Sequence, residues 1–284
     1  MVNDVRPLFD PGFTERLPQI TAALAPAVSD LPPGGRHWVF YGSRPLGLAR
    51  QGSDLNALLL LDDFRGAPHR RDGRWATVPV TIHVLSRDQF TADGHERRYG
   101  GYFALKLLAP FMSSRASDDE LLSRTTAGFL GPFAEAVADR WYRPAWSADQ
   151  LLAHAYLAFL DLHPDATSYL ARLRRHADLF GRAWRHQREV YVAALGAAGM
   201  VAPHGGNRWH YTDQAALDDA PREHARATAR FWAAGTTCHD FPDEYFTKSD
   251  VYASRAEQTA TRQALLDMVT GEGRVVEPVA GHRA

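Results

Sequence analysis

The stretch YGSRPLGLARQGSDLN, residues 41–56, decides the fold prediction for this chain. Its glycines at positions 42 and 47 allow the backbone to take positive φ angles and to approach an anion closely. The backbone N–H groups of such a turn, with a serine hydroxyl beside them, can hold phosphate oxygens. Two arginines in the same turn can add positive charge nearby. The predicted phosphate-binding residues are Gly42, Ser43, Arg44, Gly47, Arg50 and Ser53.

Apolar segments on both sides of this turn have the pattern of strands. Residues 37–41, HWVFY, form a short buried run that ends at the first glycine. Residues 54–62, DLNALLLLD, form a second apolar run directly after the turn. Because side chains alternate along a strand, Asp54 and Asn56 are expected to point to the same side.

A helix is predicted before these strands and a third strand after them. Residues 14–28 carry apolar side chains at helical spacing. Residues 63–75 are predicted as a polar connection that contains an Asp-Gly turn at 72–73. Residues 76–86 are predicted as a strand, with Pro79 at an edge or near its start because proline cannot donate to a sheet ladder.

These residues together resemble the signature of the DNA polymerase β-like nucleotidyltransferase superfamily, including its minimal and antibiotic-modifying members. The matching pattern is Gly42-Ser43, a further glycine at 47, and Ser-Asp-Leu-Asn at 53–56. The resemblance covers residues 14–90. It implies that ATP or another nucleoside triphosphate lies on the turn, and that Mg²⁺ is held by aspartates. A hydroxyl of a small acceptor molecule then attacks the α-phosphate, and pyrophosphate leaves.

The carboxylate set that this family uses is incomplete here. Asp54 matches the first family carboxylate, but Asn56 stands at the second. The third lies on a later strand, at the position of Thr81 or, with a shift of two residues, of His83. Neutral oxygens hold a hard divalent cation more weakly than carboxylates do, so two-metal transfer is expected to be impaired. The resemblance implies Asp54 as the ligand of a weak or single Mg²⁺ site.

His83 and Lys106 complete the predicted catalytic set with Asp54 and Asn56. A histidine on the third strand can act as a general base or a phosphate donor, or can simply bond to a neighbour. Lys106 ends the segment HERRYGGYFALK and can bind phosphate or carboxylate, or can instead pack its stem on a helix with its charge in water. The double glycine in this segment is unfavourable before a helix unless the backbone must approach something closely.

The rest of the chain has helical patterns. Ser117 with Glu120 and Ser147 with Gln150 are capping-box pairs, each expected to open a helix. Helices are predicted over 148–162, 167–199, 213–234 and 249–270, with loops at 202–213 and 235–248. The sequence therefore predicts an α+β fold, with strands first and helices after them. The predicted parts are a nucleotidyltransferase-like mixed-sheet domain at 1–114, a helical bundle domain at 115–271 and a flexible tail at 272–284.

Composition narrows the classes of partner. The net charge of −1 over 284 residues argues against a broad nucleic-acid-binding surface. The longest apolar run, ALLLL at 57–61, is too short to span a membrane. The lone cysteine, in Cys238-His239-Asp240, cannot form an internal disulfide and lacks zinc-site spacing. We therefore expect a cytoplasmic protein with small-molecule and nucleoside triphosphate partners, and no nucleic acid or membrane partner.

Three functional hypotheses remain open at this stage. The first is a nucleotidyltransferase that acts on a small molecule. The second is a divergent enzyme of specialised metabolism that keeps the anion site but works without a metal pair. The third is a non-catalytic nucleotide-binding protein.

Overall fold

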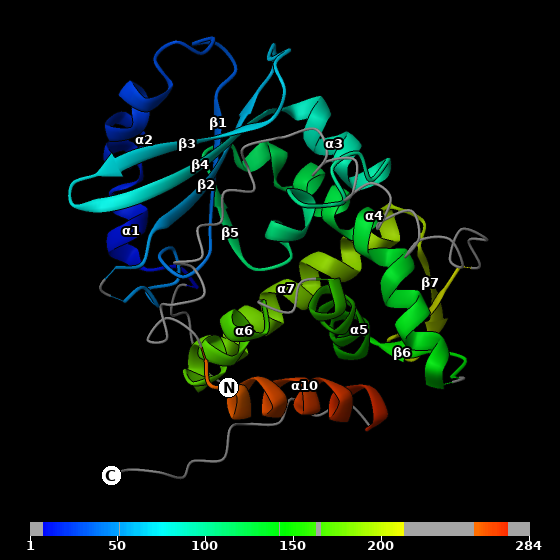
Figure 1. The fold of residues 1–284 in the computed structure, drawn as a ribbon. Coiled ribbons are helices and arrows are strands. Elements are labelled where there is room, and N and C mark those ends of the chain that lie inside the picture. The colour runs from blue at the N-terminus through cyan, green and yellow to red at the C-terminus, as the bar shows by residue number, and fades with distance from the viewer. Residues whose placement is uncertain (1–7, 51, 142, 163–165, 213–252, 272–284) are drawn as a thin grey trace, which may run out of the picture. The chain divides into compact units, whose positions relative to one another are not determined.

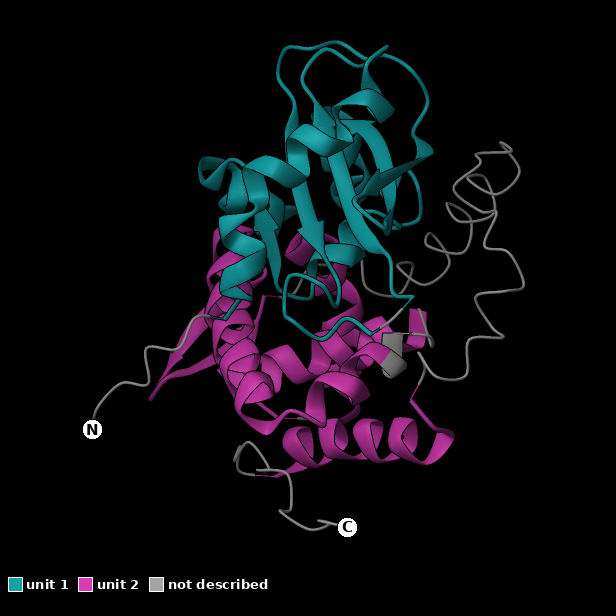
Figure 2. Cartoon of the chain, turned by 90° about the vertical axis from the view of Figure 1, so that its left-hand side faces the viewer, with its two compact units in different colours: residues 1–125, 224–247 teal, residues 126–223, 248–284 magenta. Residues whose placement is uncertain are grey.

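The computed structural model separates the chain into two compact units. It describes residues 8–50, 52–141, 143–162, 166–212 and 253–271. Residues 1–125 and 224–247 form one unit, and residues 126–223 and 248–284 form the other (Figure 2). Several predicted features lie outside the described residues: the helix at 213–234, the loop at 235–248 with Cys238, the first residues of the helix at 249–270, and the tail at 272–284. The domain limits predicted from the sequence stay a prediction.

A five-stranded mixed sheet forms the centre of the first unit (Figure 1). Its strands are β1 (His37–Tyr41), β2 (Leu55–Leu61), β3 (His69–Trp75), β4 (Val78–Ser86) and β5 (Phe111–Ser113). The strand order is β3-β4-β2-β1-β5, in which β2 and β4 are parallel and the other neighbours are antiparallel. This sheet, followed by a helical region, confirms the predicted α+β fold class.

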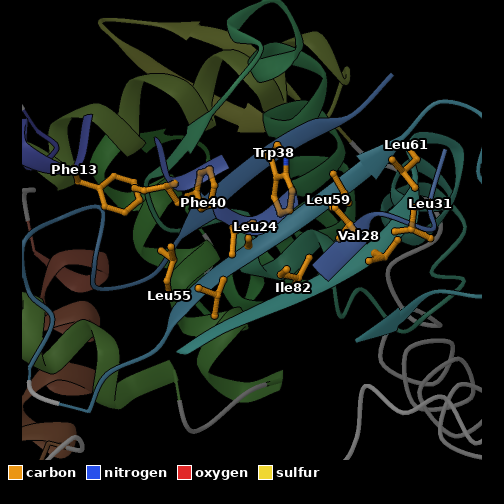
Figure 3. Packing of buried hydrophobic residues seen from close by; sticks show 14 residues of the cluster. Phe13, Leu24, Val28, Leu31, Trp38, Phe40, Leu55, Leu59, Leu61 and Ile82 are labelled. Atoms are coloured by element: carbon orange, nitrogen blue, oxygen red, sulfur yellow. The ribbon is translucent and has the colours of Figure 1, made fainter. Parts of the chain in front are cut away.

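One face of the sheet packs against the N-terminal helices. These are α1 (Pro11–Glu15), α2 (Leu17–Leu24) and the 3₁₀ helix η1 (Ala25–Val28). Side chains from α2 and η1 meet those of alternate positions on β1, β2 and β4 (Figure 3). The labelled side chains in this core include Leu24, Val28, Trp38, Phe40, Leu55, Leu59 and Ile82. Because residues 55, 57 and 59 face this core, residue 56 faces the opposite side.

The opposite face of the sheet is covered by α3 (Arg87–His95) and η2 (Ala104–Leu107). The core there includes Leu58, Leu60, Phe90 and Phe103. The helix α3 opens on a capping box in which the Ser86 hydroxyl accepts the Gln89 N–H and the Gln89 side chain accepts the Ser86 N–H. Helical structure therefore starts directly after Ser86.

The segment 63–75 is not only a connection, as predicted, because residues 69–75 form β3. They pair antiparallel with β4, and the turn lies at Ala76, which has a φ of 51°, instead of at the Asp-Gly pair. Pro79 pairs only with β3, since the pairing of β4 with β2 begins at Val80. The proline therefore lies near the start of its strand, as predicted.

The second unit is mainly helical. The helix η3 (Ala116–Asp118) still belongs to the first unit, and α4 (Asp119–Ala138) continues from the first unit into the second. The helices that follow are η4 (Asp139–Trp141), α5 (Ala148–Leu162), α6 (Ala166–Arg174), α7 (Ala177–Ala197) and α10 (Arg255–Thr270). A small sheet of β6 (Trp146–Ser147), β8 (Arg208–Tyr211) and β7 (Val201–Gly205) belongs to it. No described helix has the length and apolar character needed to cross a membrane.

Two local predictions for the helical part are corrected and one is confirmed. Ser147 and Gln150 form the predicted capping box at the start of α5. Ser117 does not cap a helix, because it lies inside η3 and α4 begins two residues later. The predicted loop at 202–213 contains the β7–β8 hairpin, whose turn uses two glycines and Asn207 at positive φ.

Candidate functional site

The glycine turn between β1 and β2 is held together by its own polar groups. Gly42 and Gly47 have φ angles of 87° and 70°, as the sequence pattern requires. The Ser53 hydroxyl accepts the Arg50 N–H at 3.0 Å, and the Ser53 N–H donates to the Arg50 carbonyl at 3.0 Å. Arg44 donates through Nε and Nη2 to the Ser53 carbonyl. Ser53 and Arg44 therefore stabilise the turn, and a phosphate would have to compete for them.

The Arg44 guanidinium lies in a partly buried position beside Asp54. Burial lowers the pKa of Arg44, and the charge of Asp54 opposes that shift. Ser43 is half-buried at the turn, while Gly47 and Arg50 are exposed. Of the predicted phosphate-binding residues, Gly42 and Ser43 directly follow β1, which ends at Tyr41.

Three side chains meet at the positions where the family pattern has carboxylates. Asn56 is the register partner of Thr81 on β4, and Asp54 immediately precedes β2. The Asp54 carboxylate accepts the Asn56 amide at 3.3 Å through Oδ1, and the Thr81 hydroxyl at 3.2 Å through Oδ2. The strand register therefore places Thr81, and not His83, opposite Asn56.

This donor set does not fit a pair of divalent cations. Asp54 is its single carboxylate, and Asn56 and Thr81 can offer a cation only neutral oxygens. The described residues contain no group of three or more His, Cys, Asp or Glu side chains that can hold a metal ion. Mg²⁺ prefers carboxylate and phosphate oxygens, so two such ions would lack charge neutralisation here.

His83 lies one alternation further along β4, on the same face as Thr81. It is 4% exposed, and its ring makes edge contacts with Tyr102 and Phe103 at centroid distances of 5.6 and 5.9 Å. Burial lowers the pKa of His83 well below its usual range, and the charges of Lys106 and Arg70 lower it further. The imidazole is therefore uncharged at neutral pH. Its Nδ1 is buried without a hydrogen-bond partner among the described residues.

Lys106 joins this end of the sheet through two tyrosine rings. Its Nζ lies 4.0 Å from the ring centre of Tyr102 and 5.7 Å from that of Tyr41. Tyr41 is the register partner of Asn56, so the ammonium lies at the strand end that carries Asp54. Cation–π contacts of this length are attractive and favour a fixed position for the charge. Sequence reasoning missed Tyr41 and Tyr102, although Tyr41 directly precedes Gly42 and Tyr102 lies four residues before Lys106.

The double glycine before Lys106 also has a structural cause. Gly100 and Gly101 have φ angles of 70° and 74°, and the backbone around them turns toward a buried aspartate on α3, Asp93. Next to it, a Cβ at Gly94 would lie 2.6 Å from the Thr125 carbonyl oxygen, so this part of α3 packs closely against α4. Sequence reasoning missed Asp93. Its one signal is an acidic side chain at a position of α3 that the structure buries.

Comparison with known proteins adds little to this description. No family model matches the chain, and no curated protein does. One similar solved structure is the crystal structure of a nucleotidyltransferase-like protein from Exiguobacterium sibiricum. It is 12% identical to this chain, covers 89% of this chain and 90% of that one, and has a TM-score of 0.29. Such a match carries no argument about the site, which is described by its own geometry.

Proposed function

We propose that this protein binds a small phosphate-bearing molecule, in the first instance a nucleoside triphosphate, at the strand ends near Asp54, and that it does so without a metal pair. The observation that carries the proposal is the hydrogen-bonded group of Asp54, Asn56 and Thr81. It offers one negative charge where two-metal transfer requires several.

Positive charge for the ligand comes instead from Lys106. A phosphate near Asp54 is repelled by the carboxylate unless a cation lies between or beside them. The Lys106 ammonium, held on the rings of Tyr102 and Tyr41, supplies a cation that needs no metal. Positive-φ glycine at 42 and the Ser43 hydroxyl provide the backbone and side-chain groups that suit phosphate oxygens.

The uncharged state of His83 suits this proposal. A buried neutral imidazole can donate through one nitrogen and accept through the other, and can therefore bind a ligand hydroxyl or phosphate in either role. Of the two roles predicted for His83, general base and phosphate donor, the proposal uses the donor role. It rests on the position of the ring beside Tyr102 and on its depressed pKa.

Calorimetric titration with ATP tests the proposal, in one series with Mg²⁺ and in another with EDTA. We expect binding in both series. Replacing Lys106 by Met should weaken binding about tenfold, since loss of a charged contact of 1–2 kcal/mol has that effect. Arg98→Met is the matched control, because Arg98 is an exposed cation in the same segment. No ATP binding to the wild-type protein, or binding that appears only with Mg²⁺, would contradict the proposal.

A second candidate is transfer of a nucleoside monophosphate to a small acceptor. The glycine turn and the half-buried Asp54 at the start of β2 favour it. Pyrophosphate release from ATP in the presence of a metabolite extract measures this activity directly. If it is the function, Asn56→Asp should raise the rate, whereas nucleotide binding without any turnover would leave the non-catalytic reading.

A further inference from the structure

Asp93 is a buried carboxylate on α3 that lies outside the group around Asp54. Its side chain has no exposed surface. The oxygen Oδ1 accepts the N–H groups of Tyr99 at 3.0 Å and Gly101 at 2.9 Å. The oxygen Oδ2 accepts those of Phe103 at 2.8 Å and Ala104 at 3.1 Å. One carboxylate thus fixes the backbone of residues 99–104, which we call the glycine loop.

Holding a charge at this position is unfavourable for folding. Burial raises the pKa of Asp93 to about 6, although the four N–H groups act in the opposite direction. A buried charge is weak evidence for stability, because an apolar side chain of similar size often stabilises a core better. The stronger effect of such a group is on specificity, since its acceptors are satisfied by only one conformation of the loop.

The conformation that Asp93 selects determines where two site residues lie. Tyr102 is placed between Gly101 and Phe103, whose N–H groups are both bound by the carboxylate. The helix η2, which carries Lys106, begins at Ala104, the last residue that Asp93 binds. Any other loop conformation would move the ring of Tyr102 and the ammonium that lies 4.0 Å from its centre.

We propose that Asp93 is a positioning residue, which shapes the glycine loop so that Lys106 is held against Tyr102 and Tyr41 at the ligand site. The inference rests on the proposed function for the meaning of that position. Its geometric part, the dependence of Lys106 on Asp93, stands without any ligand. The two parts are therefore tested separately.

The first arm of the experiment uses the full-length protein without ligand. The rate of Lys106 acetylation by a water-soluble acetyl ester is measured by peptide mass spectrometry, at one pH, in wild type, Asp93→Asn and Asp88→Asn. Asp88 is an exposed carboxylate on the same helix and serves as the control. Asparagine keeps the shape of Asp93 but puts amide hydrogens against two of the loop N–H groups. We expect a several-fold faster reaction in Asp93→Asn alone, and an unchanged rate there would overturn the inference.

The second arm measures ATP affinity in a double-mutant cycle of Asp93→Asn and Lys106→Met. If Asp93 acts through Lys106, each single variant weakens ATP binding about tenfold and the double variant is little weaker than either. Fully additive losses would show that Asp93 affects the site by a route other than Lys106, which overturns the inference. If the wild-type protein binds no ATP, the proposed function fails while the acetylation arm still decides the positioning role.

A milder variant covers the case in which Asp93→Asn does not fold. Gly101→Ala leaves the carboxylate in place and strains the residue whose φ of 74° brings its N–H to Oδ1. We expect faster acetylation of Lys106 in this variant too. The same change at the exposed Gly52, which has a φ of 83° in the turn before β2, is the control for backbone strain alone. Equal rates in wild type and Gly101→Ala would count against the inference.

Discussion

The two ends of the five-stranded sheet carry polar groups of different kinds. At one end, Asp54 accepts hydrogen bonds from the neutral side chains of Asn56 and Thr81. At the other end, the buried His37 has Nε2 2.6 Å from the Ser113 hydroxyl and Nδ1 3.1 Å from Asp118. The second group has the residue types of a hydrolytic triad, yet its surroundings give it another role.

That far end, which we call the ion-pair end, is a network of ion pairs and hydrogen bonds. The Ser113 hydroxyl is also bonded to the N–H and the carbonyl of Arg115. Asp118 also pairs with Arg87 at 2.8 Å, and Arg87 in turn contacts Asp62. Polar groups that are paired mainly with one another are expected to stabilise the fold, whereas a functional group needs capacity for a ligand. The partners of a polar group, more than its pairwise distances, therefore distinguish a ligand site from a structural network.

Acidification should show the largest effect on stability, and the ion-pair end contributes to it through His37. Burial lowers the pKa of His37 to about 4, so folded His37 stays neutral while the unfolded chain binds a proton below pH 6.5. Stability is therefore lost as the pH falls from 6.5 to 4, by up to about 3 kcal/mol. Urea unfolding at pH 7 and pH 4.5 measures this loss.

His37→Gln is the variant that isolates the contribution of this histidine. Burial also lowers the pKa of other histidines, such as His154. The loss of stability measured for the wild-type protein is therefore the sum of several histidine contributions. The variant should lose less stability than wild type between the two pH values. An identical loss in both proteins would contradict the assignment of His37 as a buried neutral group.

Asp118→Ala should have the next largest effect. The side chain is 15% exposed and touches both His37 and Arg87, and its removal leaves Arg87 with Asp62. We expect a loss of about 2 kcal/mol in the free energy of unfolding, with ATP affinity unchanged. Asp88→Ala, an exposed acid on α3, is the control. A change in ATP affinity would contradict the proposal that the ion-pair end is structural and the Asp54 end binds the ligand.

Asp54→Ala should have the smallest effect on the free energy of unfolding, and any effect it has should be on ATP affinity. The two hydrogen bonds to Asp54 are long, at 3.2 and 3.3 Å, and the side chain is half-buried, so water can replace them. We expect less than about 1 kcal/mol in urea unfolding. ATP affinity in EDTA should stay equal or rise, because a negative charge is removed from beside an anion. A stability loss as large as that of Asp118→Ala would contradict the proposed difference between the two ends of the sheet.

Sequence patterns predicted the central strands well because those strands are apolar and bounded by turn residues. Residues 37–41 are a strand with the predicted limits, and Pro79 lies near a strand start as expected. The strand β3 escaped prediction because it lies at the edge of the sheet and is mostly charged. Its Arg71 is held by both carboxylate oxygens of Asp30, a contact 41 residues away that no local pattern reveals.

The sequence pattern placed the third family carboxylate at Thr81 or, with a shift of two residues, at His83. A local pattern does not fix the pairing of parallel strands, since that pairing is set by their packing on both faces. The pairing of Asn56 with Thr81 makes that choice. The role of Asp93 was equally hidden, because it depends on N–H groups of a loop that folds back onto α3. The capping box of Ser86 with Gln89, which opens α3, has the same spacing as the pair Ser147 and Gln150 but was not among the predicted boxes.

The most direct test of the central claim is to restore the carboxylates that a metal pair would need. ATP is titrated calorimetrically, with Mg²⁺ and with EDTA, into wild type and the double variant Asn56→Asp, Thr81→Asp. We predict that wild-type affinity differs little between the two conditions. In the variant, Mg²⁺ should strengthen ATP binding, because three carboxylates then meet at the strand ends. Wild-type binding that already depends on Mg²⁺, and that Asp54→Ala abolishes, would contradict the account.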